Sequence, residues 1–328
     1  MEHGAETECV VCGVPALNKL FEVREMMVGT GDVFKYLQCE SCGSLQIKDP
    51  SVDISKYYGA GYYSMSGLPS DKYKNVIVRT VRKLRDSYEV FGRGAVGQVV
   101  DYFDPGWARV MQTLRPLAPT KDSRILDVGC GNGVLLYSLR NIGFKNLLGV
   151  DKFLDRDIDF ENGLRILHKS VDELDEGDWD VIMLHHSLEH MSNPGNVLNK
   201  IFSLLCKSGM CLIRIPIVSN FAWEKYGTSW IQLDAPRHFV IFSLKGLRGL
   251  AERVGFHLER VDFDSSEFQF WGSEQNAKGI ALLSSNSYWY GLKNSIFTKD
   301  QIKRWKQEAS VLNREMRGDQ AVIYLRKS

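Results

Sequence analysis

A glycine-rich run, ILDVGCGNG, spans residues 125–133 and has the composition of a nucleotide-binding turn. Its apolar part ends at Asp127, and three glycines then lead into a stretch with helical spacing. Glycine lets the backbone pass close to a ligand, and the first amides of the following helix can hold the ligand's polar groups. The run therefore predicts a strand, a turn and a helix around a bound cofactor.

The spacing of acids and glycines favours S-adenosylmethionine over a nicotinamide dinucleotide. The dinucleotide fingerprint has its third glycine one residue later, and here an acid precedes the first glycine. Asp151 ends a second apolar run twenty residues beyond Gly131, where a carboxylate can accept from both ribose hydroxyls. The structural alternative for this motif is a glycine turn that only packs a helix against a strand.

The residues predicted to surround the cofactor lie at the carboxyl ends of predicted strands, where ligands bind in open α/β sheets. Ser170 and Val171 would flank the adenine, and His185 follows the fourth strand together with His186, which could line the cofactor equally well. The full predicted set is Asp127, Gly129, Gly131, Asn132, Asp151, Lys152, Ser170, Val171 and His185.

Four of the seven cysteines form two C-x-x-C pairs separated by twenty-six residues, Cys9 with Cys12 and Cys39 with Cys42. A glycine follows each pair, and two such turns can present four thiolates tetrahedrally to zinc. A closed four-cysteine site has no open coordination position, so we predict structural zinc that positions the adjacent tyrosine-rich segment. The alternatives are reduced thiols or a redox pair, although a redox site needs no second copy.

Short apolar runs alternate with amphipathic segments after residue 123, as expected for buried parallel strands and their crossover helices. We predict a doubly wound, seven-stranded Rossmann-like α/β sheet. The predicted strands lie within residues 125–128, 146–151, 164–167, 179–184, 210–215, 257–264 and 319–327. The predicted helices lie within residues 134–142, 195–205, 244–254 and 299–317, with one or two more between 72 and 114.

This pattern predicts three parts of the chain. Residues 1–50 would form the zinc ribbon, and residues 51–120 a tyrosine-rich flap with a helical linker. Residues 121–328 would form the cofactor-binding domain, with an insertion at about 264–318.

The net charge and the lengths of the apolar runs argue against polyanion binding and membrane insertion. The net charge is +1 over 328 residues, and no run approaches the ~18 apolar residues that would span a bilayer. The amino terminus lacks the basic start and apolar core of a signal peptide. We therefore expect a cytoplasmic monomer or homodimer without a membrane span, and we do not expect a nucleic-acid partner.

Two histidines are candidates for acid–base chemistry. Methyl transfer from a sulfonium is an in-line displacement, in which a hydroxyl acceptor must also lose its proton. Histidine titrates near neutrality and suits that task. His190 follows the fourth predicted strand and His238 the fifth, so both would approach the cofactor from the acceptor side. A solvated or core hydrogen-bonding role is the alternative for each.

Together these motifs resemble the class I S-adenosylmethionine-dependent methyltransferases over about residues 123–261. LDVGCGNG matches the first motif of this family, and Asp151 matches the acid that binds the ribose in it. HHSLEHMSNP matches the segment that follows the family's fourth strand. A narrower resemblance is to the zinc-ribbon methyltransferases of bacterial surface-glycan and deoxysugar pathways. It rests on the two C-x-x-C-G pairs, the Y-x-x-x-Y-Y-S segment and the run DAPRHFVIFSLKGL. The sugar C-methyltransferases among them have an extra carboxyl-terminal α/β domain that these residues do not match, so we expect O-methylation and not C-methylation.

The resemblance implies roles for individual side chains. His238 matches the catalytic base of the sugar methyltransferases, and His190 belongs to the same pocket. A tyrosine of the flap would reach the active site, with Tyr63 the first choice and Tyr62 the second, although packing between domains would also explain these tyrosines. The candidate acceptor-binding residues could equally form a helical core; they are Trp223, Tyr226, Trp230 and Arg237.

We therefore predict an S-adenosylmethionine-dependent methyltransferase that acts on a hydroxyl of a sugar, a nucleotide-linked sugar or a surface glycan. The first alternative is an RNA methyltransferase that uses the ribbon to bind nucleic acid, although residues 1–50 are not basic. The second alternative is a non-catalytic module that retains cofactor binding.

Overall fold

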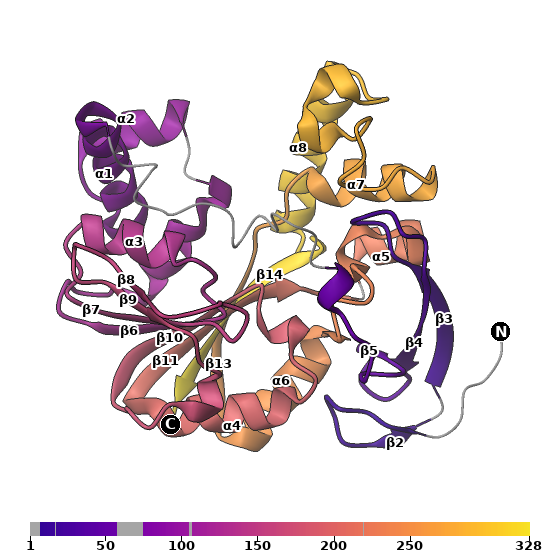
Figure 1. Ribbon diagram of the computed structural model, residues 1–328, viewed down its shortest axis with the longest axis horizontal. Helices are drawn as coiled ribbons and strands as arrows, with labels where there is room; N and C mark the ends of the chain where they lie inside the picture. Colours follow the sequence, from indigo (N-terminus) through magenta and orange to yellow (C-terminus); the bar gives the residue numbers. More distant parts are fainter. Residues whose placement is uncertain (1–6, 17, 58–74, 105–106, 219) are drawn as a thin grey trace. The chain divides into compact units, whose positions relative to one another are not determined.

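The computed structural model describes residues 7–16, 18–57, 75–104, 107–218 and 220–328 (Figure 1). The chain divides into two units, each assembled from separate segments. The first contains Met1–Ala60, His186–Asn199 and Ile213–Leu325, and we call it the cysteine unit. The second contains Gly61–His185, Lys200–Leu212 and Arg326–Ser328, and we call it the glycine-loop unit.

A mixed eight-stranded sheet runs in the order β13-β14-β11-β10-β6-β7-β9-β8. All seven predicted strands are present, which confirms the predicted α/β fold class. The additional strand, β8, has two residues and pairs antiparallel with β9. The strands are β6 (Arg124–Val128), β7 (Asn146–Val150), β8 (Ile158–Asp159), β9 (Arg165–Leu167), β10 (Trp179–His185), β11 (Leu205–Pro216), β13 (Phe256–Phe263) and β14 (Gln320–Lys327).

In the glycine-loop unit, β6 pairs in parallel with both β10 and β7. The apolar runs that predicted these strands are buried, with Ile125, Leu126 and Ile182 all at 0% exposure. Buried parallel strands must be apolar on both faces because helices cover them. Since the strands run in the same direction, the turns that follow β6, β7 and β10 leave the same edge of the sheet.

The helices of this unit begin and end at residues suited to those positions. The side chain of Asn75 accepts from two amides at the start of α1, and Gly92 ends α1 in the left-handed conformation. Figure 1 shows α1, α2 and α3 gathered on one side of the strands β6 to β9, and α1 packs against the other helices. The helices are α1 (Val76–Phe91), α2 (Ala95–Phe103), η3 (Trp107–Leu117), α3 (Val134–Asn141) and η4 (Val171–Glu173). α4 (Pro194–Leu204) precedes β11.

The cysteine unit contains a four-stranded sheet in the order β12-β5-β4-β3. Three strands come from the amino-terminal module, whereas β12 lies in the later segment Ile213–Leu325 of the same unit and pairs antiparallel with β5. A short pair, β1 with β2, contains the first two cysteines in its turn. The strands are β1 (Thr7–Glu8), β2 (Pro15–Ala16), β3 (Asn18–Arg24), β4 (Val33–Cys39), β5 (Leu45–Ile47) and β12 (Val240–Ile241).

Helices of the cysteine unit also follow capping rules. Ser243 caps the start of α6, and Thr298 and Gln301 form a capping box at the start of α8. α7 and α8, in the predicted insertion, share a small core of Phe270, Ala309 and Leu312. The helices are α5 (Phe221–Tyr226), α6 (Leu244–Val254), α7 (Phe268–Ala277) and α8 (Lys299–Arg314), with η1 (Ser55–Tyr57), η5 (Leu188–His190), η6 (Gly227–Ser229), η7 (Ile231–Leu233), η8 (Tyr288–Tyr290) and η9 (Leu292–Asn294).

Among the described residues, every helix is too short or too polar to span a lipid bilayer.

Candidate active site

The glycine run forms a tight turn between β6 and α3. Gly129, Gly131 and Gly133 have φ angles of 76°, 55° and 79°, in the left-handed region that favours glycine. The amide of Gly129 donates to the carbonyl of Val150 at 2.8 Å, which ties the turn to the end of β7. A Cβ atom at Gly133 would lie 2.7 Å from Cδ1 of Ile166. The last glycine is therefore required both for its conformation and for space.

Asp151 follows β7 directly and is 7% exposed. Its Oδ2 accepts from the amide of Gly131 and its Oδ1 from the amide of Phe153, both at 2.9 Å. An ionised carboxylate has about four acceptor positions. One bond on each oxygen leaves acceptor capacity for a pair of ribose hydroxyls, so the residue fits its predicted role.

The other predicted cofactor residues also lie in the glycine-loop unit. Asn132 and Val171 are buried, and Nζ of Lys152 lies 4.9 Å from the centroid of the adjacent phenylalanine ring. Ser170 caps η4 through a reciprocal pair of bonds with Glu173. His185 is the last residue of β10. The structure thus places the predicted cofactor set at or just beyond the carboxyl ends of β6, β7, β9 and β10.

Asp127 is buried at 3% exposure near the end of β6. Its Oδ1 has no hydrogen-bond partner among the described residues. Burial, together with the negative charge of Asp151, raises the pKa of Asp127 to about 7. A buried carboxylate oxygen without a donor fits a site for a cationic or hydrogen-bond-donating ligand, as S-adenosylmethionine is.

We expect the affinity for S-adenosylmethionine to fall as the pH is lowered through about 7. The cofactor carries sulfonium and ammonium charges, so it favours the ionised form of Asp127, whose pKa of about 7 lies above the usual range. Below that pH the carboxyl is protonated, and each further pH unit costs up to about tenfold in Kd. Calorimetry between about pH 5.5 and 8.5 measures this slope. An Asp127→Asn variant with the same pH dependence as wild type would contradict the assignment.

Asp151→Ala is expected to weaken cofactor binding about tenfold to hundredfold. Bonds from hydroxyls to a charged carboxylate contribute roughly 1.5–3 kcal/mol. Asp151→Asn keeps one acceptor oxygen and should lie between wild type and alanine in Kd. The matched control is Asp159→Ala, because Asp159 of β8 is an exposed carboxylate paired with Arg165. Equal Kd values for Asp151→Ala and the control would exclude the ribose role.

His190 and His238 face each other in the cysteine unit, with ring centroids 4.7 Å apart and planes at 72°. Nδ1 of His190 lies 2.9 Å from the carbonyl oxygen of Arg237, and Nδ1 of His238 lies 2.8 Å from that of Gln232. Carbonyl oxygens only accept, so we assign the hydrogen to each Nδ1 and a lone pair to each Nε2. Burial and the neighbouring His238 lower the pKa of His190 to about 4, which keeps this ring neutral.

Asp234 provides a negative charge beside this pair. Its Oδ2 lies 3.6 Å from Nε2 of His238, and its Oδ1 pairs with Arg237. Burial opposes ionisation of Asp234, but the positive charge of Arg237 and the proximity of His238 outweigh it and lower the pKa. The ionised carboxylate can therefore stabilise a protonated His238.

Glu189 completes the cluster and is 0% exposed. Its Oε1 accepts from Nδ1 of His186 at 3.2 Å, and His186 has a left-handed φ of 51°. Burial raises the pKa of Glu189, although the two neighbouring histidines lower it. The sequence interpretation missed both Glu189 and Asp234 as site residues. For Glu189 the available signal was its position directly before His190.

Hydrogen bonds from the amino-terminal module to main-chain carbonyls hold His238 in place. The hydroxyl of Tyr36 donates to the carbonyl oxygen of His238 at 2.7 Å, and Tyr36 is 0% exposed. The amide of Ile47 donates to the carbonyl of Phe239 at 2.8 Å, where β5 begins to pair with β12. The position of the histidine thus depends on the fold of the amino-terminal module.

The four predicted zinc ligands converge in that module. Their Sγ atoms all lie within 4.8 Å of one another, with Cys9 to Cys42 and Cys12 to Cys39 both at 3.7 Å. In both turns the amide after the second cysteine donates back to the carbonyl of the first, and the glycine there has a positive φ. Donation from the Cys9 thiol lowers the pKa of Cys42 to about 4. Four converging thiols fit a small zinc ribbon.

The predicted acceptor-binding residues differ in their burial and in their partners. Trp230 is 0% exposed and its Nε1 donates to Asp319, while Arg237 is engaged with Asp234. Trp223 is half-buried between Phe21 and Trp230, and the hydroxyl of half-buried Tyr226 donates to Glu274. The two predicted flap residues lie outside the described residues; they are Tyr62 and Tyr63.

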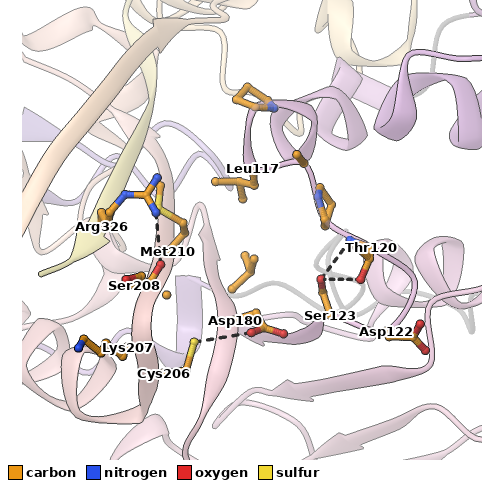
Figure 2. Close-up of a pocket in the computed structure, with 15 residues that line it drawn as sticks. Leu117, Thr120, Asp122, Ser123, Asp180, Cys206, Lys207, Ser208, Met210 and Arg326 are labelled. Carbon is orange, nitrogen blue, oxygen red and sulfur yellow. Dashed lines mark hydrogen bonds between the residues drawn. The ribbon is translucent and has the colours of Figure 1, made fainter.

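A pocket of about 490 Å³ lies at the opposite edge of the glycine-loop unit's strands (Figure 2). Residues at the beginnings of β6, β10 and β11 line it, including Ser123, Asp180 and Cys206. The glycine run follows the other end of β6. None of the predicted site residues lines this pocket, so it is separate from the predicted cofactor site.

Comparisons with known proteins point to methyl transfer. The family described as "Methyltransferase domain" matches residues 102–261. A tRNA U34 carboxymethyltransferase of Helicobacter pylori is 28% identical over 150 residues, covering 42% of this chain and 58% of that protein. A ubiquinone biosynthesis O-methyltransferase of Psychrobacter cryohalolentis is 28% identical over 102 residues, covering 27% of this chain and 39% of that protein. The chain thus spans less than two thirds of these relatives.

Among solved structures, an S-adenosylmethionine-dependent methyltransferase from Archaeoglobus fulgidus is similar with a TM-score of 0.42 and 18% identity. The alignment covers 70% of this chain and 99% of that chain. The family match spans the glycine run, Asp151 and the strands that position them. Residues 102–261 therefore match a methyltransferase domain, and the structure gives this segment parallel strands and a glycine turn typical of a Rossmann-like fold.

Proposed function

We propose that the protein transfers a methyl group from S-adenosylmethionine to a hydroxyl of a sugar, a nucleotide-linked sugar or a surface glycan. One observation carries the proposal. Buried His238 and half-buried His190 each direct Nδ1 to a main-chain carbonyl, which leaves two Nε2 lone pairs in one cluster. A hydroxyl acceptor needs such a base because its proton must leave as the carbon–oxygen bond forms.

His238 is the proposed base. As the acceptor oxygen attacks the methyl carbon and the carbon–sulfur bond breaks, Nε2 of His238 takes the hydroxyl proton. The carboxylate of Asp234, 3.6 Å from that nitrogen, would then stabilise the imidazolium. His190 packs against the base and contributes a second lone pair to the cluster.

The chain sequence connects the two halves of the proposed chemistry. His185 ends β10 among the proposed cofactor residues, and His190 follows five residues later. Ligands of open α/β sheets bind beyond the carboxyl ends of the strands. The resemblance to the sugar methyltransferases also implies a role for Tyr63, with Tyr62 as the second choice, and both lie outside the described residues.

The choice of acceptor rests on three lines of support. The motifs in residues 9–43 and 234–247 resemble those of sugar methyltransferases. One relative is named as an O-methyltransferase, whose acceptor atom is an oxygen. Trp223 and Tyr226 are half-buried aromatic residues, which suit a sugar ring, and buried Trp230 and Arg237 are proposed to belong to the same acceptor-binding set.

RNA is the second candidate acceptor. Several relatives are named as tRNA U34 carboxymethyltransferases. Arg79 and Lys83 are exposed on α1, where they could contact phosphates. The net charge of +1 argues against a large phosphate-binding surface.

A methyl-labelling experiment tests the proposal. The purified chain and labelled S-adenosylmethionine are incubated with nucleotide-linked sugars, surface-glycan fragments and structured RNA, and mass spectrometry locates the added methyl group. Label on a sugar hydroxyl is the expected result. Label in RNA alone would replace the proposal with the second candidate. Cofactor binding without transfer to any acceptor would favour a non-catalytic module.

A further inference from the structure

The cluster around His238 has the composition of a metal site as well as that of a base. Glu189, His190 and His238 each contribute one potential ligand atom, and these three atoms all lie within 4.8 Å of one another. They come from η5 and from the segment directly before β12. All three residues belong to the cysteine unit and are separate from the four cysteines.

The histidines are oriented as metal-ligating histidines are. In such sites one ring nitrogen donates to a carbonyl or carboxylate, which fixes the tautomer and directs the other nitrogen to the ion. Here Nδ1 of His190 donates to Arg237 and Nδ1 of His238 to Gln232. Both acceptors are main-chain carbonyls, so the orientation does not depend on a mobile side chain.

The third group supplies an unpaired negative atom. Oε1 of Glu189 accepts from His186, whereas Oε2 is buried and has no hydrogen-bond partner among the described residues. Burying a carboxylate oxygen without a donor is costly. Two lone pairs and an unpaired carboxylate oxygen form a set of acceptors that a cation would satisfy.

We infer that Glu189, His190 and His238 bind one divalent transition-metal ion, with zinc as the ion of best fit. Two imidazoles and one carboxylate are ligands that zinc takes in sites with an open position, whereas magnesium prefers oxygen ligands and water. Bond lengths of about 2.0–2.2 Å require the three atoms to approach to roughly 3.3 Å, which small side-chain rotations supply. With three protein ligands, this site would differ from the closed four-cysteine site in having a coordination position open.

The ion has a consequence that rests on the proposed function. The Nε2 lone pair of His238 cannot both bind an ion and accept a proton. Occupancy of the site should therefore inhibit methyl transfer, and a chelator that leaves the cysteine-bound zinc in place should restore it.

Zinc calorimetry on the full-length protein tests the site. The chain is first treated with a mild chelator, and elemental analysis is expected to find one zinc per chain, held by the cysteines. Titration should then show one further binding event. Cobalt titration separates the two sites, because only cysteine coordination gives intense thiolate-to-metal absorption. Absence of the second event in wild type would overturn the inference.

Variants identify the ligands. Glu189→Gln and His190→Gln should each abolish the second event or weaken it at least about tenfold, since each removes a ligand. The matched control is His257→Gln, because His257 is an exposed histidine on β13 away from the cluster. Retained cysteine-bound zinc, together with retained S-adenosylmethionine binding, shows that both units of a variant are folded. If both ligand variants bind the second zinc as wild type does, the inference is wrong.

Activity measurements separate this inference from the proposed function. Saturating zinc is expected to slow transfer at least about tenfold. If zinc bound to the site and methyl transfer became faster, the metal site would stand and the assignment of His238 as the base would be wrong. Normal transfer with no second zinc would overturn the site and leave the base assignment intact.

Discussion

His238→Gln is expected to lower kcat for methyl transfer about 10²- to 10⁴-fold, the usual contribution of a general base. Glutamine is close to histidine in size and can still donate to the carbonyl of Gln232, but it has no basic nitrogen at the Nε2 position. The proposed cofactor residues all lie in the glycine-loop unit. The Kd for S-adenosylmethionine should therefore stay within about twofold of wild type.

Two further variants make this result specific. His190→Gln should reduce kcat less than His238→Gln, because the carboxylate of Asp234 lies beside His238. His257→Gln changes an exposed histidine outside the cluster and should have the kcat of wild type. Wild-type kcat in His238→Gln would exclude this residue as the base. A loss of the cysteine-bound zinc or of cofactor binding in the same variant would point to misfolding instead.

The central sheet could be predicted because its strands are buried on both faces. Continuous apolar runs identified β6, β7 and β10 to within one residue at either end. β11 extends to Leu205, five residues before its predicted start, because polar residues such as Lys207 and Ser208 interrupt the apolar run there. β8 and β12 have two residues each, too few for any periodicity to show.

Individual residues of the site could be predicted from the sequence, but their arrangement could not. His190 and His238 could each be recognised from local motifs, but forty-eight residues separate them, and their contact depends on the fold. The sequence held no signal for the carbonyls of Gln232 and Arg237, since every residue has a carbonyl. Asp234 was overlooked because its importance comes from its distance to His238. Tertiary hydrogen bonds, and not residue type, decide these roles.

Loss of the zinc predicted for the four cysteines is expected to abolish methyl transfer and to leave most cofactor binding intact. Cys42→Ser removes one of four thiolates, and a structural zinc contributes on the order of 10 kcal/mol to the folding of a small module. Cys42 lies in the turn between β4 and β5, and β5 pairs with the strand that follows His238. Unfolding of this module would therefore release the proposed base.

The affected bonds can be followed from the cysteines to the histidine. Ser243 Oγ donates to the carbonyl of Cys42, and the amide of Ser243 donates to Ser44, so the turn also anchors the start of α6. Tyr36 of β4 holds the carbonyl of His238. Tyr36→Phe removes this single bond, which contributes roughly 1 kcal/mol, and should lower kcat far less than Cys42→Ser.

Zinc content, kcat and cofactor affinity must be measured on the same preparations. Cys42→Ser should lose the cysteine-bound zinc, become more sensitive to proteolysis within residues 7–57, and show at least about a 10²-fold lower kcat. Cys206→Ser is the matched control, because Cys206 lies outside the cluster beside Asp180 in the other unit. If Cys42→Ser lost its zinc and kept wild-type kcat, the module would not be what positions His238, and β12 would have to hold its place through α6 and the rest of its own unit.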